Sequence, residues 1–170
     1  MQIIIGGDTC ITSDFLSKKI IDNQIIDLFK ASDFNMLNLE CPVTDTLPKE
    51  VRIKTGPRLK TRNGIFSVLK KLRIDAVSLA NNHILDYGGV GLAETIRNCL
   101  DFGIDYVGAG ANAIEASKPL IVVRNGVTVA FVNFCENEWS IAMPRSGGAN
   151  SMDVVDNYNQ IREVKQQADY

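Results

Sequence analysis

The chain has 170 residues, of which 45% are hydrophobic and 22% charged, and its formal net charge at pH 7 is −2. This length allows one domain with a buried core, and the composition is that of an ordinary globular protein. The slightly acidic balance argues against a general nucleic-acid binder, which carries a clear basic excess.

Strands and helices are predicted to alternate along the first hundred residues. Residues 2–5, 34–39 and 75–80 are short apolar runs typical of buried strands, and Gly6–Asp8 after the first run predicts a tight turn. Apolar residues three and four positions apart predict helices between these runs. Those residues are Ile21, Ile25 and Leu28 in the first helix, Ile65, Leu69 and Leu72 in the second, and Leu92, Ile96 and Leu100 in the third. Gly103 is placed to end the third helix.

The remaining residues predict a hairpin and a last helix. Residues 106–107 suggest a very short strand, and Asn112 with Glu115 indicates a weak capping box for one helical turn. Asn125–Gly126 between two apolar runs predicts a hairpin with a type I′ turn. Residues 146–148 predict a mobile loop. The last helix would carry one apolar face, formed by Val154, Tyr158, Ile161 and Val164.

This order of elements predicts an α/β fold in which a mainly parallel sheet is flanked by helices and accompanied by a β-hairpin. We treat residues 1–170 as a single domain. Since the carboxyl ends of parallel strands meet at one edge of the sheet, the residues that follow each strand are expected to lie together.

Polar side chains follow all three strands at this edge: Asp8, then Glu40, then Asn82 with His83. Carboxylate, amide and imidazole ligands suit divalent Mn, Fe or Zn. Two such ions about 4 Å apart can clamp a phosphoryl group and activate water. The sequence therefore predicts a metal site at the edge of the sheet.

Each of these residues also has a purely structural explanation. His83 is the only histidine of the chain, and a single histidine is often structural. Asp8 could cap a turn, Glu40 could pair with a lysine, Asn82 could hold a turn, and Asp86 could cap the helix that follows. Their joint placement at one edge favours a site.

Residues 43–63 form a long connection with five cations of one parity: Arg52, Lys54, Arg58, Lys60 and Arg62. In an extended segment, these side chains would point to the same side. They could form a charged edge that blocks aggregation. Alternatively Arg52, Lys54, Arg58 and Lys60 could bind an anionic substrate.

Several stretches resemble the bacterial CapA-type family, which is linked to capsule and poly-γ-glutamate synthesis within the calcineurin-like metallophosphatase superfamily. The matching stretches are Gly7–Asp8, Asn38–Pro42, Ala80–His83 with Asp86 and Gly88, Gly108–Gly110 through Ala116, and Asn133–Glu138. The resemblance implies the N-terminal half of an α/β/β/α sandwich. It implies Asp8, Glu40 and Asn82 as metal ligands and His83 as a catalytic acid or transition-state donor. Asn81 and Asp86 would support the turn around them.

Two departures from the family pattern matter. Cys10 stands where the superfamily usually has a histidine, and we expect it near the metal ligands, either as a packed thiol or as a ligand for zinc or iron. The resemblance also implies further histidines downstream, which this chain does not contain. We therefore expect the N-terminal part of a longer parent protein, in which a binuclear centre of Mn, Fe or Zn would be complete.

Two functions are weighed: part of a metal-dependent phosphoesterase-like protein, and a catalytically inactive α/β scaffold or interaction module derived from that family. A nucleotide-binding domain is a weaker third option, because Gly108–Gly110 offers only a fragment of the dinucleotide fingerprint. The expected partner is an anionic small-molecule or polymer substrate, and no nucleic acid. A homo-oligomer is expected through the apolar surface that the missing half would cover.

The cellular compartment is inferred from the first residues and the cysteines. Met1 leads directly into Ile3–Ile5 without the basic and cleavage segments of a signal peptide, and no apolar run approaches the roughly 20 residues of a membrane helix. The four cysteines lack C-x-x-C spacing, which suggests reduced thiols. We expect a cytoplasmic chain, although a sequence without its signal would look the same and a parent protein could be associated with the cell envelope.

Overall fold

The computed structural model describes residues 1–12, 15, 21–45, 47 and 54–170. Its elements in chain order are β1 (Ile3–Thr9), α1 (Asn23–Ala31), β2 (Phe34–Leu39), α2 (Ile65–Lys71), β3 (Ala76–Ser78), α3 (Gly88–Asp101), β4 (Asp105–Val107), β5 (Ala109–Gly110), α4 (Ala113–Ala116), β6 (Leu120–Arg124), β7 (Val127–Phe131), β8 (Gly148–Ala149) and α5 (Val154–Val164). Strands β1 to β4 form a parallel sheet in the order β1-β2-β3-β4, and β6 and β7 form an antiparallel hairpin. The expected α/β fold is confirmed.

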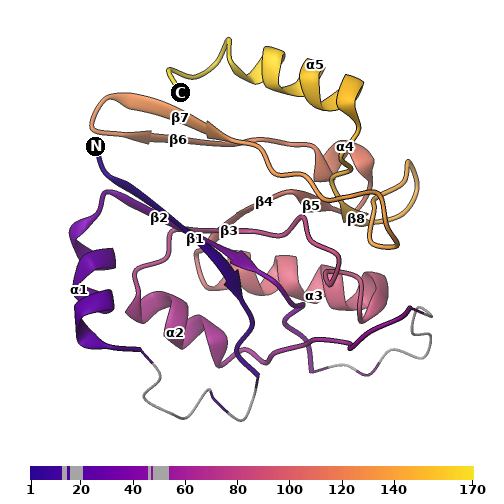
Figure 1. The fold of residues 1–170 in the computed structure, drawn as a ribbon, viewed down its shortest axis with the longest axis horizontal. Coiled ribbons are helices and arrows are strands. Elements are labelled where there is room, and N and C mark those ends of the chain that lie inside the picture. The colour runs from indigo at the N-terminus through magenta and orange to yellow at the C-terminus, as the bar shows by residue number, and fades with distance from the viewer. Residues whose placement is uncertain (13–14, 16–20, 46, 48–53) are drawn as a thin grey trace.

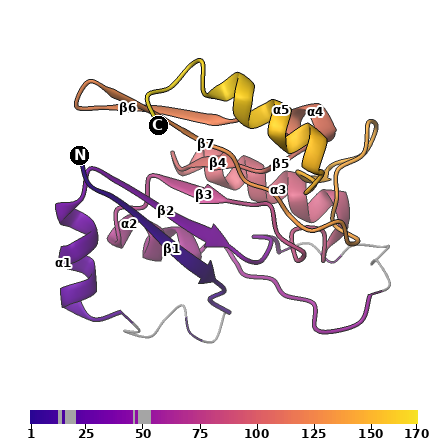
Figure 2. The same cartoon turned by 45° about the horizontal axis from the view of Figure 1, so that its top comes forward.

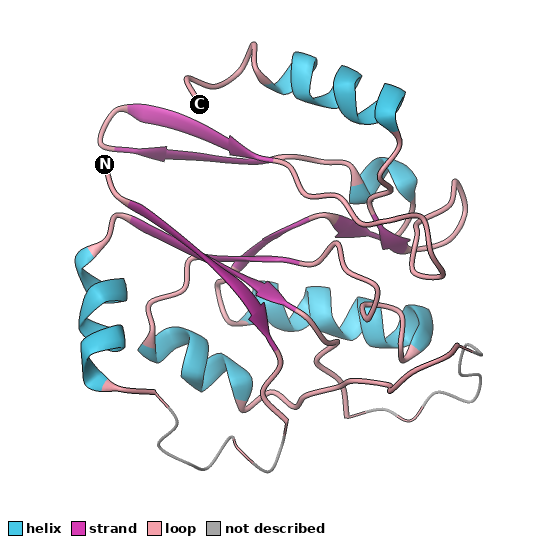
Figure 3. Cartoon of the chain, in the orientation of Figure 1, coloured by secondary structure: helices cyan, strands magenta, loops and turns pink. Residues whose placement is uncertain are grey.

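The parallel sheet separates two layers (Figures 1 and 3). Helices α1, α2 and α3 cover one face, and the β6–β7 hairpin with α5 lies over the other. Figure 2 shows the same layers in a tilted view. Leu37 and Leu39 pack toward the helices, whereas Phe34 and Met36 pack with the hairpin, because successive side chains of a strand point to opposite faces. Both faces of the sheet are therefore buried where these residues lie, which is the usual state of a parallel sheet.

Helices α2 and α1 differ in how well their periodicity predicted the buried face. The predicted apolar stripe of α2 is confirmed, since its members are all buried. In α1 the predicted stripe was wrong: Ile25 and Leu28 are exposed, and Ile26 and Phe29 are buried instead. The neighbouring stripe carries the larger Phe29 ring, and this is the stripe that packs into the core below the sheet.

Helix α5 forms as predicted, but its apolar residues are mostly outside the core. Val154 is 84% exposed and Tyr158 is 64% exposed, whereas Val164 is buried. In α3, similarly, Leu92 is buried and Leu100 is exposed. Among the helices of the described residues, none has the length and apolar character needed to cross a bilayer.

The predicted turn chemistry is largely confirmed. Asn125 and Gly126 both have positive φ, 53° and 75°, and join β6 to β7, as a type I′ turn requires. Gly103 follows α3 with φ 67°. The Asn112 side chain accepts a hydrogen bond from the Glu115 backbone at 3.0 Å, and this caps the single turn of α4.

The mobile loop predicted at residues 146–148 was wrong. Gly148 lies in β8, opposite Gly110 of β5. A Cβ atom added to Gly148 would meet the Ser140 carbonyl oxygen at 2.4 Å. Glycine is therefore required here for close packing of backbones rather than for mobility.

Candidate functional site

Asp8 reaches the site through an irregularity in β1. The register with β2 shifts between Ile5 and Asp8, so that β1 contains one more residue than the segment it faces. This is a β-bulge at Gly6–Gly7, and the strand continues past the glycines, so the predicted tight turn was wrong. A bulge changes the direction of the side chains that follow it. A Cβ atom on Gly6 would lie 2.2 Å from Leu37 Cδ2, which explains the glycine.

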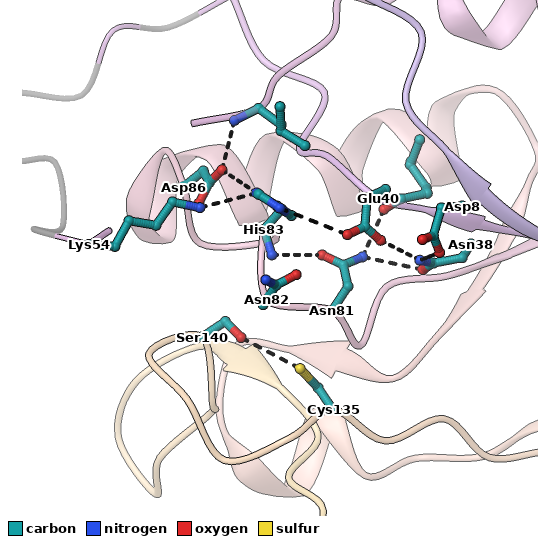
Figure 4. Close-up of polar contacts among 12 residues, drawn as sticks. Asp8, Asn38, Glu40, Lys54, Asn81, Asn82, His83, Asp86, Cys135 and Ser140 are labelled. Carbon is teal, nitrogen blue, oxygen red and sulfur yellow. Dashed lines mark hydrogen bonds and ion pairs between the residues drawn. The ribbon is translucent and has the colours of Figure 1, made fainter. Parts of the chain in front are cut away.

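Asn38 joins the two carboxylates predicted as metal ligands. Its Nδ2 donates to Asp8 Oδ1 at 2.8 Å and to Glu40 Oε2 at 2.5 Å, and Figure 4 shows the three side chains side by side. Asp8 lies opposite Asn38 in the parallel register, and Glu40 follows the end of β2. Two strand ends thus bring their carboxylates to one amide group.

Asn81 connects this carboxylate pair to the histidine turn. Its Nδ2 donates to the Leu39 carbonyl at 2.9 Å and lies 3.3 Å from Asn38 Oδ1. Its Oδ1 accepts from the backbone N–H of His83 at 3.1 Å. The side chain therefore fixes the turn after β3 relative to the end of β2.

The His83 ring lies between two carboxylates (Figure 4). Its Nδ1 is 2.7 Å from Asp86 Oδ2, and its Nε2 is 3.9 Å from Glu40 Oε1. The Asp86 side chain is fully buried, and its Oδ2 also accepts from the Leu59 N–H at 2.7 Å. Asp86 does not cap α3, whose N-cap is Tyr87 without a side-chain hydrogen bond. The structure thus places Asp86 behind the imidazole.

Lys54 is buried beside Asp86 and His83. Its side chain is 2% exposed, its ammonium forms an ion pair with Asp86 Oδ1, and its Nζ is 3.1 Å from His83 Nδ1. The Trp139 ring centroid lies 5.6 Å from the same ammonium. Lys54 is therefore not part of an open rim, where the sequence placed it.

The other cations of the predicted basic rim have partners or surroundings that differ from those of Lys54. Arg52 is outside the described residues. Arg58 is exposed, and the Lys60 ammonium lies 4.9 Å from the centroid of the Tyr87 ring. Arg62 pairs with Asp45 at 3.3 Å. The contact of these cations with an anionic substrate stays a prediction.

A pocket of about 370 Å³ opens beside the carboxylates. Its lining residues are Glu40, Ala80, Asn81, Asn82, Phe134, Cys135, Glu136, Glu138 and Met152. The Asn82 side chain lines this pocket, and its backbone carbonyl accepts from Trp139 Nε1 at 2.8 Å. Within the described residues, no hydrogen bond ties the Asn82 amide to Asp8 or Glu40, so its metal-ligand role stays a prediction.

The environment of Glu40 disfavours its negative charge. Burial, followed by the nearby Asp8 carboxylate, raises the pKa of Glu40, while the Asn38 hydrogen bond and His83 act in the opposite direction. The side chain keeps 17% of its surface exposed, on the side of the pocket. A cation bound there would relieve both the desolvation and the repulsion.

The donor set at this edge fits part of a metal site. Asp8 and Glu40 are hard oxygen donors that accept from one amide group, and this ligand type suits a divalent cation. Among the described residues, however, no three His, Cys, Asp or Glu side chains converge in a way that could hold a metal ion. The pair can supply two ligands, and the rest of a coordination sphere would have to come from Asn82, water or other groups.

The cysteines near the site differ in exposure. Cys10 is exposed and Cys41 is buried, and neither is in a disulfide. Burial, then the neighbouring Cys10, raises the pKa of the Cys41 thiol far above its ordinary value. Cys41 is therefore a neutral packed thiol, whereas a ligand or supporting role of Cys10 stays a prediction.

Four residues of the site were not predicted as such. Asn38 had a signal, because it is a polar residue inside an apolar strand. Glu136, Glu138 and Trp139 also belong to a polar cluster that follows β7, but their position could not be inferred, because long-range contacts bring this segment to the Asn82 turn.

Comparison with known proteins shows the family to which the chain is similar. The sequence model of the family described as bacterial capsule synthesis protein PGA_cap matches residues 7–170. The chain is 32% identical over 115 residues to the PGA biosynthesis protein CapA of Bacillus subtilis, covering 64% of this chain and 29% of that protein. It is 30% identical over 139 residues to the capsule biosynthesis protein CapA of Bacillus anthracis, covering 80% and 34%.

A third relative is a probable polyglutamine synthesis accessory protein of Mycobacterium tuberculosis, 36% identical over 92 residues that cover 54% of this chain and 24% of that protein. The matched region thus spans about a third or less of the length of each of these relatives. Because the family match extends over nearly the whole chain, the protein belongs to the bacterial capsule synthesis PGA_cap family.

Proposed function

We propose that the chain is the N-terminal part of a metal-dependent phosphoesterase-like protein that acts in capsule or poly-γ-glutamate synthesis. The observation that carries this proposal is the pair of carboxylates, Asp8 and Glu40, which share the Asn38 amide at the carboxyl edge of a parallel sheet. Membership of the family and the names of the relatives support the biological process. The reaction itself is supported only by the residues of the site.

In this proposal Asp8, Glu40 and Asn82 hold a divalent cation. Such a cation would neutralise the two carboxylates and polarise a phosphoryl oxygen. Its identity would be Mn, Fe or Zn, and a second ion would need ligands from outside the described residues. The substrate would be an anionic small molecule or polymer bound at the 370 Å³ pocket.

His83 would act on the phosphoryl group as an acid or transition-state donor. Asp86 holds Nδ1 of the ring at 2.7 Å, which leaves Nε2 on the side of Glu40. Asn81 fixes the backbone of the same residue. The chain's own residues thus orient the imidazole before any ligand arrives, which is what a positioned proton donor needs.

A catalytically inactive scaffold or interaction module is the second candidate. The observation that favours it is the incomplete donor set, since the described residues bring together only two carboxylates of the required kind. In that case Asn38, Asn81 and Asp86 would serve only to hold the turns together.

Metal binding separates the two candidates. The purified chain would be dialysed against Mn²⁺, Fe²⁺ or Zn²⁺ and its metal content measured by elemental analysis. Asp8→Asn and Glu40→Gln should each lose the bound metal, whereas Asp27→Asn, an exposed carboxylate change on α1, should keep it. Equal metal content in all four proteins would overturn the proposed ligands, and a folded wild-type chain that binds none of the three metals would favour the scaffold.

A further inference from the structure

The ammonium group of Lys54 is buried, and a buried charge must be compensated by a partner. Its side chain is 2% exposed, and it comes from the long connection between β2 and α2, far in sequence from its partners. Burial of an unpaired ammonium is strongly unfavourable, so buried lysines are found with compensating partners. The partner here is Asp86, whose carboxylate is 0% exposed.

The two oxygens of Asp86 have different partners (Figure 4). Oδ1 forms the ion pair with Lys54 Nζ. Oδ2 lies 2.7 Å from His83 Nδ1 and accepts the Leu59 N–H at the same distance. The carboxylate is thus held from both sides, and the imidazole shares Oδ2 with the Leu59 N–H.

This arrangement decides which ring nitrogen of His83 carries a hydrogen. Nδ1 faces a carboxylate oxygen at 2.7 Å and a lysine ammonium at 3.1 Å. A carboxylate oxygen can only accept, so a contact of 2.7 Å requires a hydrogen on Nδ1. The ammonium carries only donors and pairs electrostatically with Asp86 Oδ1, so it cannot be the acceptor of the Nδ1 hydrogen, and the carboxylate oxygen is. Nε2 is then the nitrogen turned toward Glu40.

Without Lys54, Asp86 Oδ1 would be a buried oxygen that has lost its ion-pair partner. The carboxylate could then rotate or take up a water molecule, and the hydrogen bond to Nδ1 would no longer be fixed. Neither the Leu59 N–H nor the His83 ring replaces this ion pair, because both lie at Oδ2. Lys54 is thus the ion-pair partner of the oxygen that the Leu59 N–H and the imidazole leave open.

We propose that Lys54 is a positioning residue for His83: by pairing with Asp86 Oδ1, it fixes the imidazole with hydrogen on Nδ1 and with Nε2 facing Glu40. Its importance for activity rests on the proposed function, but the fixed state of the ring does not. This role differs from the substrate-binding role that the sequence suggested for Lys54.

The single histidine makes this proposal testable without signal assignment. A long-range ¹H–¹⁵N spectrum of the ¹⁵N-labelled full chain contains one imidazole. It would be recorded with a chelator present and with the ring in its neutral form. We expect two well-separated nitrogen signals, with Nδ1 in the protonated state and Nε2 in the unprotonated state.

In Lys54→Met, the Nδ1 and Nε2 signals should move toward a common averaged position. In Lys54→Arg, they should stay separated as in wild type, because the guanidinium keeps a positive charge next to Asp86. Lys60→Met is the matched control: its ammonium also lies over an aromatic ring, that of Tyr87, and its loss should leave the spectrum unchanged. If Lys54→Met does not fold by circular dichroism, Lys54→Gln offers a neutral donor to Oδ1 and should give an intermediate separation.

Two results would overturn the proposal. One is a wild-type ring with its hydrogen fixed on Nε2, and the other is a folded Lys54→Met or Lys54→Gln protein with the wild-type spectrum. Because the spectra are taken without metal, they do not depend on the metal-binding experiment. If the chain binds no metal, the proposed function fails and the role of Lys54 stands. If the Lys54 variants keep the wild-type spectrum, the role of Lys54 fails and the proposed function stands.

Discussion

The two layers on either side of the parallel sheet differ in how completely they are packed. On the helical side, α2 buries Phe66 completely, and its ring stacks on Phe102 with 4.5 Å between centroids. On the hairpin side, α5 leaves most of its apolar residues in solvent, and Val154 is the most exposed of them. The comparison teaches that α2 is firmly packed against the sheet whereas α5 is not: the strand ends of the site are anchored in the core that α2 helps to form, and the pocket beside them is also lined by the segment after β7.

The largest expected effect comes from opening the closed layer. Phe66→Ala should lower the free energy of unfolding by about 3–5 kcal/mol, because it removes a buried ring and leaves a cavity. Tyr158→Ala on α5 is the matched aromatic change in the open layer and should alter it by no more than about 0.5 kcal/mol. Urea unfolding followed by circular dichroism measures both. Similar losses in the two variants would show that the layers do not differ as described.

Gly108 tests the junction between the layers. It has φ 91°, and a Cβ atom there would meet Asn133 Oδ1 at 2.3 Å and Ala80 Cβ at 2.8 Å. Gly56 has φ 92° with open space around it, so Gly56→Ala reports the backbone strain alone. Gly108→Ala should be less stable than Gly56→Ala by about 1–3 kcal/mol, the usual cost of overpacking. Equal stability of the two variants in urea unfolding would contradict the close packing at Gly108.

The open face of α5 sharpens the expectation of a homo-oligomer. If two copies cover this face, the double variant Val155→Lys, Tyr158→Lys should shift the chain to a lower mass in sedimentation velocity at high concentration. Leu100→Lys places a lysine at an exposed apolar position of α3 in the other layer and should leave the mass unchanged. A wild-type chain that is monomeric at every concentration would contradict the expected assembly.

The smallest expected effect on the free energy of unfolding comes from removing the charge of Glu40. Its folded-state pKa lies above the ordinary value of 4.5, so the folded protein is favoured at low pH and loses this contribution as pH rises through the raised pKa. With a chelator present, Glu40→Gln should therefore be more stable than wild type at pH 7, and the gain should vanish as pH falls below 4.5. Urea unfolding across this range measures the trend. Glu163→Gln on α5 is the control for loss of a surface charge, and a gain for Glu40→Gln that does not depend on pH would contradict the assignment.

Much of the fold could be predicted from local patterns. Alternation of apolar runs with helical stripes identified the parallel sheet, and Asn125–Gly126 identified the hairpin, because each depends on residues close in sequence. Local patterns could not show which stripe of α1 is buried or that the apolar face of α5 stays open, because tertiary packing decides both. They also could not show that the glycines in β1 form a bulge or that Gly148 belongs to a strand.

The candidate site was predictable to a similar extent. The topology rule that gathers strand ends at one edge brought Asp8, Glu40 and His83 together in advance. Asn38 was overlooked as a bridge, although it is a polar residue within an apolar strand. The burial of Lys54 and the contact of Trp139 with the Asn82 turn depend on chain segments far apart in sequence, and no periodicity within either segment reports such contacts.

The Trp139 contact has a practical consequence for future measurements. This is the only tryptophan of the chain, and its indole N–H donates to the Asn82 carbonyl at 2.8 Å. All tryptophan fluorescence therefore originates from a residue that contacts the turn carrying His83, with no second tryptophan as background. A ligand that moves this turn would change the emission directly, so the protein contains a label-free optical sensor of its own candidate site.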